Sequence, residues 1–301
     1  MDGETMMVTG SAGRQLFWSS LRERLGWLGW HAICVPVAIC CVAPLVWMAS
    51  SSLKSQQTVF SDFSLIPAKP QWENFAIAWT QGKFGIYFFN SVLYTAVIVL
   101  GVVSVSALAA YAFSRFTFKG SGGLYKLVLS TMLIPIPGAF VALYILVKLL
   151  GLIDTGSGQV VARLGYILPQ INAGLPLGIF IMKPFFDKIP KDLEESAEVD
   201  GCGVLGVFWH VMIPLARPAL GVVALLTSIA AWNEFMWAYL VFSRPELMPL
   251  QRGLLAFQGE HLTDYALLMA ATLIAIAPIV VIYLVMQRTI IQGITAGALK
   301  G

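Results

Sequence analysis

The sequence predicts an all-α protein that crosses a membrane several times, and two observations support this prediction. Hydrophobic residues make up 58% of the chain, charged residues only 12%, and the mean hydropathy is +0.78. A soluble domain needs about a quarter of its residues charged to cover its surface, so most of this chain faces lipid. Long charge-free intervals also recur along the chain, and in lipid such segments must pair their backbone groups internally, as a helix does.

Six charge-poor intervals have the length of a transmembrane helix. A helix needs about 20 apolar residues to cross a hydrocarbon core about 30 Å thick. The intervals are residues 25–53, 84–114, 127–147, 164–182, 218–243 and 265–287. We therefore expect a polytopic domain of six helices over residues 31–292, after an N-terminal extension of residues 1–30 and before a C-terminal tail of residues 293–301. The extension up to about Ser20 is expected to be poorly ordered.

The distribution of Lys and Arg predicts the orientation of these spans. An even number of spans places both termini on one side of the membrane. Lys and Arg are more frequent in the N-terminal segment, the second and fourth loops and the tail than in the other loops. Positive charge favours the cytoplasmic side, so both termini are expected there. The first span is too long for a signal peptide, and we expect it to be retained.

The loop of residues 184–218, between the fourth and fifth spans, has the most informative pattern. Pro190 and the acidic residues after it are typical of a helix N-terminus, and Gly201 is typical of the residue that ends a helix. A second short amphipathic helix is expected to follow and to stop at Pro214. On composition alone, this hairpin could be an interfacial connector between two spans.

Three short motifs in this loop resemble the EAA loop of ABC importer permeases. The family pattern is Glu-Ala-Ala, then Asp-Gly, then Ile-x-Leu-Pro. The matching residues are Glu195-Ser196-Ala197, Asp200-Gly201 and Val211-Met212-Ile213-Pro214. Ser196 replaces an alanine and Ile213 a leucine. The residue types, their spacing and the cytoplasmic position of the loop all agree with the pattern.

Two further segments extend the resemblance over nearly the whole chain from about Val35. Residues 232–237, Trp-Asn-Glu-Phe-Met-Trp, and the tail of residues 293–301 resemble the maltose-type, MalG-like carbohydrate permease family. The binding-protein-dependent inner membrane components of this family have the type I ABC importer permease fold. The resemblance therefore implies that the chain is a permease subunit of an ATP-driven importer for a carbohydrate.

The resemblance also implies which residues meet the motor of the transporter. In this family the EAA loop is a coupling helix that docks in a cleft of the ATP-binding subunit. This assigns ATPase coupling to Glu195, Ser196, Ala197, Asp200 and Gly201. Ala197 and Gly201 would permit close approach, and Glu195 and Asp200 would cap the turn or pair with cations of the partner.

The implied partners are a second, homologous permease subunit in a heterodimer, a dimer of ATP-binding subunits with ATP and Mg²⁺, and an extracytoplasmic solute-binding protein. The sequence contains no Gly-x-x-x-x-Gly-Lys-Ser/Thr phosphate loop and no catalytic constellation. We therefore expect no enzymatic activity and no cofactor on this chain. Lys and Arg are scattered and not clustered, so the sequence does not predict nucleic-acid binding. The spacings of His and Cys are not those of a metal site. The location implied is a prokaryotic inner membrane.

A substrate path is predicted around Glu234, the only charged residue within the six intervals. Ionisable residues inside a membrane usually face a polar cavity, although a structural bond to the partner permease is an alternative. Asn233 could hydrogen-bond sugar hydroxyls, and Trp232 or Trp237 could stack on a sugar ring. Plain packing is the alternative for each tryptophan. Neighbours in a helix point about 100° apart, so these residues cannot all face one cavity.

The alternative function is a stand-alone secondary transporter or channel for a small polar solute. Such a protein is expected to contain more intramembrane carboxylates and an internal inverted repeat. Neither is evident in the sequence. The carried solute stays undefined: oligosaccharides, sugar acids, polyols and glycerol-phosphate derivatives all fit the resemblance.

Overall fold

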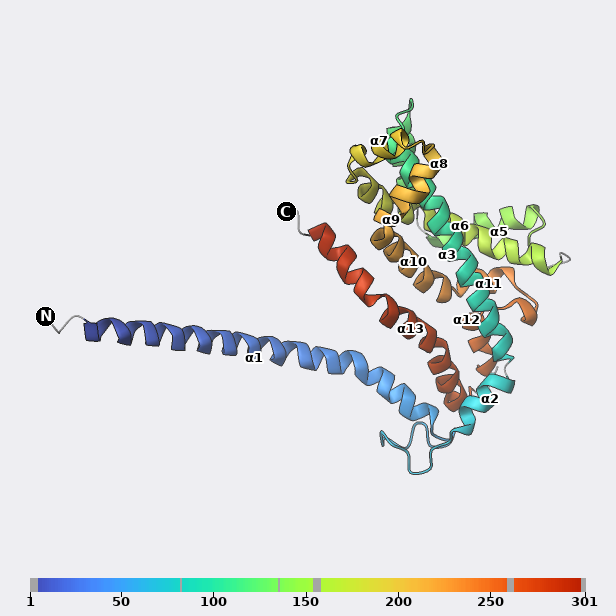
Figure 1. Cartoon of the computed structure of the whole chain (residues 1–301). Helices are drawn as coiled ribbons and strands as arrows, with labels where there is room; N and C mark the ends of the chain where they lie inside the picture. Colours follow the sequence, from blue (N-terminus) through green and yellow to red (C-terminus); the bar gives the residue numbers. More distant parts are fainter. Residues whose placement is uncertain (1–4, 82, 135, 154–157, 259–262, 299–301) are drawn as a thin grey trace.

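The computed structural model describes residues 5–81, 83–134, 136–153, 158–258 and 263–298. Within these residues the chain is helical, and it contains no strand beyond one isolated bridge between Gln258 and Thr263. The predicted all-α class is therefore confirmed. Figure 1 shows a body of packed helices from which the first helix extends to one side.

Five helices are the main elements of the chain. They are α1 (Thr5–Ser52), α3 (Phe84–Arg115), α6 (Gln159–Asp187), α10 (Arg217–Trp232) and α13 (Tyr265–Ala298). Shorter α-helices connect them: α2 (Glu73–Gln81), α4 (Ser121–Ser130), α5 (Ile136–Leu149), α7 (Lys191–Val199), α8 (Val204–Val207), α9 (Ile213–Leu215), α11 (Met236–Val241) and α12 (Leu250–Gly253). The remaining turns are the 3-10 helices η1 (Thr131–Leu133), η3 (Pro245–Leu247) and η4 (Leu254–Phe257), and the π-helical η2 (Phe208–Met212).

The described residues do not confirm the predicted count of six spans. Four segments are long and apolar enough to cross a membrane: Gly29–Ser52, Phe84–Arg115, Gln159–Asp187 and Tyr265–Gln287. A fifth span forms only if Val204–Leu215 and Arg217–Trp232, which differ in direction by 78°, are counted together. Each of the four covers most of one predicted interval.

Two predicted intervals are interrupted. The interval 127–147 contains Pro135 and Pro137, and its helix is divided into α4, η1 and α5. Proline lacks a backbone N–H and clashes with the preceding turn, so a single straight helix cannot pass through this pair. The interval 218–243 is divided after Trp232, and the helix resumes as α11.

The first and last helices extend beyond the intervals from which their spans were predicted. Helix α1 begins at Thr5 and α13 continues as far as Ala298. Residues next to an existing helix can join it without the cost of helix nucleation. The N-terminal extension of residues 1–30 and the tail of residues 293–301 stay predictions.

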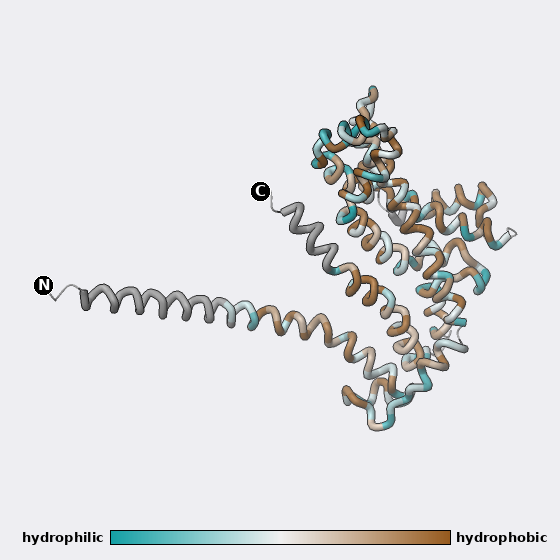
Figure 2. The backbone as a smooth tube through the Cα atoms, viewed as in Figure 1, coloured by the Kyte–Doolittle hydropathy of each residue, from teal (hydrophilic) through white to brown (hydrophobic). Residues whose placement is uncertain are grey.

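Large apolar side chains cover the outer surface of the helices. Phe89 and Leu100 on α3 are both about two-thirds exposed, and Figure 2 shows that hydrophobic residues recur along α1, α3 and α13. In water such an extensive apolar surface would be unfavourable, whereas lipid accommodates it. The exposure pattern agrees with a membrane protein.

The packing of α3 against α6 forms the centre of the body. Gly174 and Gly178, one turn apart on α6, face Val102 and Ser106 on α3. A Cβ at Gly174 would lie 2.7 Å from Val102 Cγ2, and one at Gly178 would lie 2.6 Å from Ser106 Oγ. Small residues at this spacing allow two membrane helices to approach closely. Helix α10 packs against both α3 and α6, and α13 covers α10.

Candidate coupling and translocation sites

The predicted coupling helix is present as α7, within a hairpin that also includes α8, η2 and α9. Helix α7 starts after Pro190 and carries Asp192 and Glu194 in its first turn, where the helix dipole favours negative charge. It ends at Val199, as the sequence predicted. We call residues 188–216 the coupling hairpin.

Gly201 closes α7 with a Schellman motif. The Cys202 N–H donates to the Ala197 carbonyl and the Gly201 N–H to the Glu198 carbonyl, both at 2.9 Å. This motif requires a left-handed residue, and Gly201 has a φ of 86°. Apart from its two chain neighbours, no described residue would lie within 4 Å of a Cβ at this position, so the local need for glycine is conformational.

The second helix of the coupling hairpin does not stop at Pro214, contrary to the prediction. The π-helical turn η2 leads directly into α9, which contains Pro214 and ends at Leu215. Pro214 lies at the junction between the π-helical turn η2 and α9, within a continuous helical run. The break therefore falls at Ala216, before α10.

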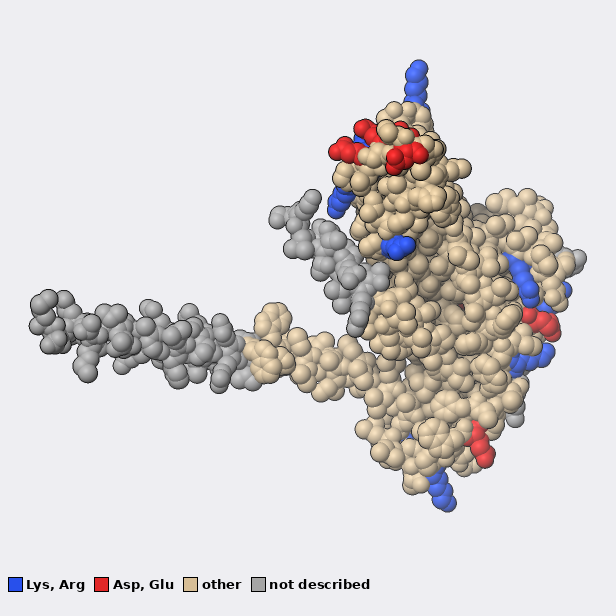
Figure 3. Space-filling model, in the orientation of Figure 1, with Lys and Arg blue, Asp and Glu red and all other residues tan. Residues whose placement is uncertain are grey.

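The outer face of α7 is polar and accessible. Glu195, Ser196, Asp200 and Gly201 are exposed, and Ala197 is half-buried against the core. The Ser196 hydroxyl donates to the Asp192 carbonyl. Within the described part of the chain, the carboxylates of Glu195 and Asp200 have no hydrogen-bond or ion-pair partner. Figure 3 shows acidic side chains gathered at the tip of the molecule over α7.

The inner face of α7 is attached to α3 through a contact that sequence analysis missed. Arg115, the last residue of α3, forms an ion pair with Glu194, and its Nη2 donates to the Ile189 carbonyl at 2.8 Å. The side chains of Arg115 and Glu194 are only 8% and 13% exposed. No sequence signal connects these residues, because their proximity depends on how α3 and α6 pack.

A cavity of about 360 Å³ lies among α3, α5, α6, α10 and α11. Its lining is mainly apolar, and it includes Ile98, Phe140, Leu143, Pro169, Leu177 and Val223. The side chains with polar groups in this lining are Gln170, Thr227, Glu234 and Trp237. Two of the four residues predicted for the substrate path, Glu234 and Trp237, therefore meet at this cavity.

Glu234 lies at the break between α10 and α11 and caps the shorter helix. Its Oε1 accepts a hydrogen bond from the Trp237 N–H at 2.6 Å, and its Oε2 accepts one from the Ala238 N–H at 3.0 Å. These N–H groups belong to the first turn of α11 and have no carbonyl partner within that helix. The carboxylate thus makes a helix break inside the body possible.

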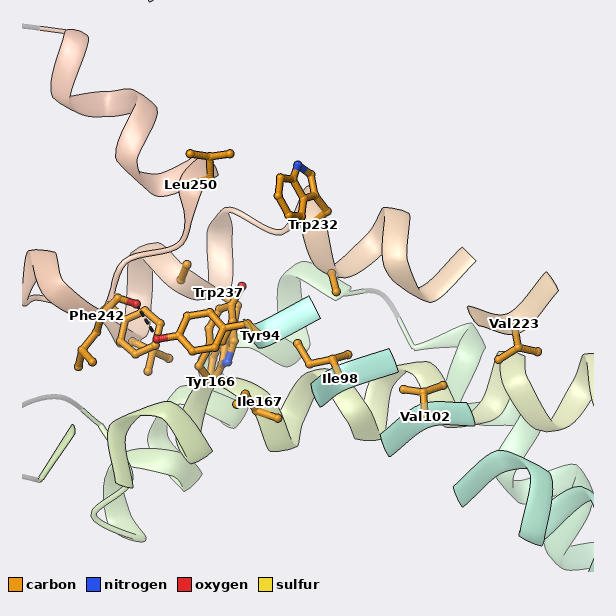
Figure 4. Packing of buried hydrophobic residues seen from close by; sticks show 14 of the residues in the cluster. Tyr94, Ile98, Val102, Tyr166, Ile167, Val223, Trp232, Trp237, Phe242 and Leu250 are labelled. Atoms are coloured by element: carbon orange, nitrogen blue, oxygen red, sulfur yellow. Dashed lines mark hydrogen bonds between the residues drawn. The ribbon is translucent and has the colours of Figure 1, made fainter. Parts of the chain in front are cut away.

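Trp237 forms one wall of the cavity. It is 2% exposed, its indole N–H donates to the Gly165 carbonyl at 3.3 Å, and its ring stacks on Phe140. Figure 4 shows it beside Tyr94 and Tyr166. Gly165 also lies close to Leu152, since a Cβ there would lie 2.0 Å from the Leu152 carbonyl oxygen.

The other two predicted substrate-path residues lie outside the cavity lining. The Trp232 indole is buried against other helices: its N–H donates to the Ala275 carbonyl of α13 at 2.9 Å. Asn233 is exposed and donates to the Ile229 carbonyl at 2.9 Å. Trp232 therefore packs between helices, which was the alternative to stacking on a sugar ring. Trp232 and Trp237 point to different neighbours because they lie on different helices, α10 and α11.

Among the described residues, no group of three or more His, Cys, Asp or Glu side chains is placed to hold a metal ion. The described cysteines, Cys34, Cys40, Cys41 and Cys202, are free thiols.

Comparison with known proteins decides the family. Residues 108–296 match the family described as the binding-protein-dependent transport system inner membrane component. The chain belongs to this family. The match covers the coupling hairpin and most of the helices that line the cavity, so this member of the family is a permease subunit of an ABC transporter located in the inner membrane. This membership argues against the alternative of a stand-alone transporter.

Individual relatives agree with the family match. The chain is 36% identical over 86% of its length to the probable ABC transporter permease protein YurM of Bacillus subtilis, of which 83% is covered. It is 34% identical over 88% of its length to the trehalose/maltose transport system permease protein MalG of Thermococcus litoralis, of which 94% is covered. It is 30% identical over 90% of its length to the diacetylchitobiose uptake system permease protein NgcG of Streptomyces coelicolor, of which 88% is covered.

A solved structure supports the fold. A chain of a bacterial ABC transporter involved in the import of the acidic polysaccharide alginate superposes with a TM-score of 0.75 at 24% identity. The superposition covers 89% of this chain and 97% of the other. The predicted ABC importer permease fold is therefore confirmed.

Proposed function

We propose that this chain forms part of the translocation path of an importer for a carbohydrate and that a separate ATPase subunit drives it. Support for the solute class comes from the relatives, whose names refer to trehalose/maltose and diacetylchitobiose. The cavity fits this class, because an indole such as that of Trp237 can pack against the apolar face of a sugar ring.

The observation that carries the proposed coupling role is the outward polar face of α7. Glu195, Ser196 and Asp200 are exposed at the tip of the molecule, and the Schellman motif at Gly201 fixes the end of the helix. In our proposal this tip, with Ala197, docks in a cleft of the ATPase, where the free carboxylates pair with basic side chains. ATP and Mg²⁺ are held by that partner.

The same proposal sets the orientation and the remaining partners. The coupling hairpin and both termini are cytoplasmic, in accord with the distribution of Lys and Arg. A second, homologous permease subunit completes the path in a heterodimer. An extracytoplasmic binding protein delivers the solute; one solved alginate transporter includes an alginate pentasaccharide-bound periplasmic protein.

The proposed mechanism uses the geometry of the chain. Closure of the ATPase dimer moves α7, and the buried contact of Arg115 with Glu194 transfers this movement to α3. Helices α3 and α6 move together because their small residues pack closely. The cavity between α3, α6 and α10 then opens to alternate sides of the membrane. Trp237 and Glu234 line the path, and Trp232 and Asn233 support it from outside the cavity.

The test is uptake by the reconstituted transporter. The chain would be purified with its partner permease and ATPase, placed in proteoliposomes, and supplied with the binding protein and a panel of sugars. We expect ATP-dependent accumulation of at least one oligosaccharide, and stimulation of ATP hydrolysis by the same sugar. Accumulation that needs an ion gradient and no ATP would contradict the proposal.

A further inference from the structure

Helix α3 holds the coupling hairpin at its last residue. Arg115 forms the ion pair with Glu194 of α7 and donates to the Ile189 carbonyl just before α7. Both charged side chains are largely buried, so removal of one leaves the other unpaired away from water. Tyr111, one turn earlier, packs its ring against Phe208 of the same hairpin at 5.3 Å between centroids. The hairpin is therefore tied to α3 by polar and aromatic contacts.

The other end of α3 holds a second segment by hydrogen bonds from two buried side chains. This segment, residues 245–257, contains η3, α12 and η4, and we call it the 245–257 loop. Asn90 donates to two carbonyls of this loop, those of Glu246 at 2.8 Å and Met248 at 3.1 Å. Tyr94 donates to the Leu247 carbonyl at 2.9 Å. Each of these bonds joins an α3 side chain to backbone, so it fixes the course of the loop.

Two more contacts strengthen the attachment of the 245–257 loop. The Ser91 hydroxyl accepts a hydrogen bond from the Leu250 N–H at 2.8 Å. Gly253 lies so close to the ring of Tyr87 that a Cβ would come within 2.2 Å of it. Asn90 and Ser91 are 2% and 3% exposed, so water does not compete for these bonds.

Between these two attachments, α3 is one continuous helix. It has 32 residues and no internal proline, which corresponds to a length of about 48 Å at 1.5 Å per residue. Figure 1 shows it running from the region of α2 and α12 to the region of α7 and α8. Its close packing on α6 at Gly174 and Gly178 opposes bending. The coupling hairpin and the 245–257 loop are thus fixed to opposite ends of one stiff element.

We propose that α3 transmits movement of the coupling hairpin to the 245–257 loop, with Arg115 and Asn90 as the positioning residues at its two ends. The inference rests on the proposed function, because it takes the ATPase as the source of the movement. It adds a destination for that movement: the 245–257 loop, at the opposite end of α3 from the coupling hairpin. Loss of either attachment would leave the other end of α3 intact and interrupt the transmission.

The experiment uses two reporter positions in the complete transporter. The native cysteines are replaced by serine, and a polarity-sensitive fluorophore is attached through Lys188→Cys on the hairpin or Glu246→Cys on the loop. Both side chains are exposed, and the Asn90 bond uses only the backbone of Glu246. Emission is recorded in proteoliposomes with and without a non-hydrolysable ATP analogue. We expect the analogue to shift the emission at both positions.

Substitutions at the two ends of α3 then test whether Arg115 and Asn90 are needed for the transmission. With Arg115→Gln or Asn90→Ala, we expect the hairpin reporter to keep its response and the loop reporter to lose it. The exchange Arg115→Glu with Glu194→Arg should restore part of the loop response, which a general folding defect would not allow. Val97→Ala, at an exposed position of α3, is the control that keeps both responses. Assembly of every variant is checked by co-purification of the ATPase.

Three results would overturn the inference. In the chain without Arg115 or Asn90 substitutions, the ATP analogue could shift the emission at the hairpin reporter and leave the loop reporter unchanged. This result would contradict the transmission through α3 but not the proposed function. A loop response that survives Arg115→Gln and Asn90→Ala contradicts the role of these two residues. If neither reporter responds in an assembled complex, the proposed coupling to the ATPase fails, and this inference fails with it.

Discussion

The Glu234 carboxylate accepts hydrogen bonds from the backbone of Trp237 at 2.6 Å and of Ala238 at 3.0 Å, and in this way it caps α11 within the membrane domain. The same contact brings Trp237 to the wall of the cavity. Glu234 thus has a structural role that its isolated charge did not reveal. A residue that was predicted to meet the solute thus caps the helix that carries one wall of the cavity.

Substitution of Glu234 separates these two roles. Glu234→Ala removes both acceptors and should destabilise the chain by about 1–2 kcal/mol, the typical effect of losing a helix cap. Glu234→Gln keeps one acceptor and should retain more stability and more uptake. Thermal unfolding of the purified complex and solute uptake measure the two effects. Loss of uptake in Glu234→Gln with unchanged stability would instead point to a direct role of the charge.

Gly201 should not tolerate a β-branched residue. Its left-handed φ of 86° closes the Schellman motif, and a residue with a side chain pays about 1–2 kcal/mol in this conformation. Gly201→Val is therefore expected to distort the end of α7 and to reduce solute uptake more than ATP hydrolysis. Gly203→Ala is the matched control, because Gly203 has an extended backbone and open space around its Cβ position. Equal uptake by both variants would refute this explanation.

The contact of α3 with α6 should be sensitive to a single added methyl group. Gly178→Ala would place a Cβ 2.6 Å from Ser106 Oγ, and overpacking of this kind costs about 1–3 kcal/mol. We expect a lower unfolding temperature for the complex in detergent. Gly123→Ala on α4 is the control, since no described atom outside the backbone of that helix and the residues next to Gly123 lies within 4 Å of that Cβ position. An unchanged unfolding temperature in Gly178→Ala would show that the helices separate more easily than their packing indicates.

The buried ion pair between Arg115 and Glu194 should show strong coupling in a double-mutant cycle. Removal of one partner from such a pair costs about 3–5 kcal/mol, because the remaining charge is unpaired. The losses of stability in the two single alanine variants should therefore add up to more than the loss in the double variant. The pair of Lys183 and Asp187, at 2.7 Å but more exposed, serves as the reference. There we expect a coupling energy of about 0.5 kcal/mol or less.

The sequence predicted those parts of the fold that depend on local chemistry. Long charge-free intervals located α3, α6 and the apolar parts of α1 and α13. Pro190 and Gly201 located both ends of α7, because a proline just before a helix and a left-handed glycine just after it act on their own helix alone. The family resemblance then supplied the coupling role that composition did not.

The features that the sequence did not predict depend on distant contacts. The break in the fifth interval is stable because Glu234 reaches the backbone of α11, and hydropathy carries no information on that bond. The pairing of Arg115 with Glu194 joins residues that are far apart in the chain. Which of Trp232 and Trp237 lines the cavity is likewise decided by the packing of α10 and α11 on their neighbours.

Docking of α7 on the ATPase is the central claim, and site-specific photocrosslinking tests it most directly. A photoreactive amino acid would replace Glu195 on the exposed face of α7, or Leu100 on the apolar surface of α3, in the intact transporter. We predict that the probe at position 195 captures the ATPase subunit and that the probe at position 100 does not. An assembled, ATP-hydrolysing transporter in which position 195 captures no ATPase would contradict the account.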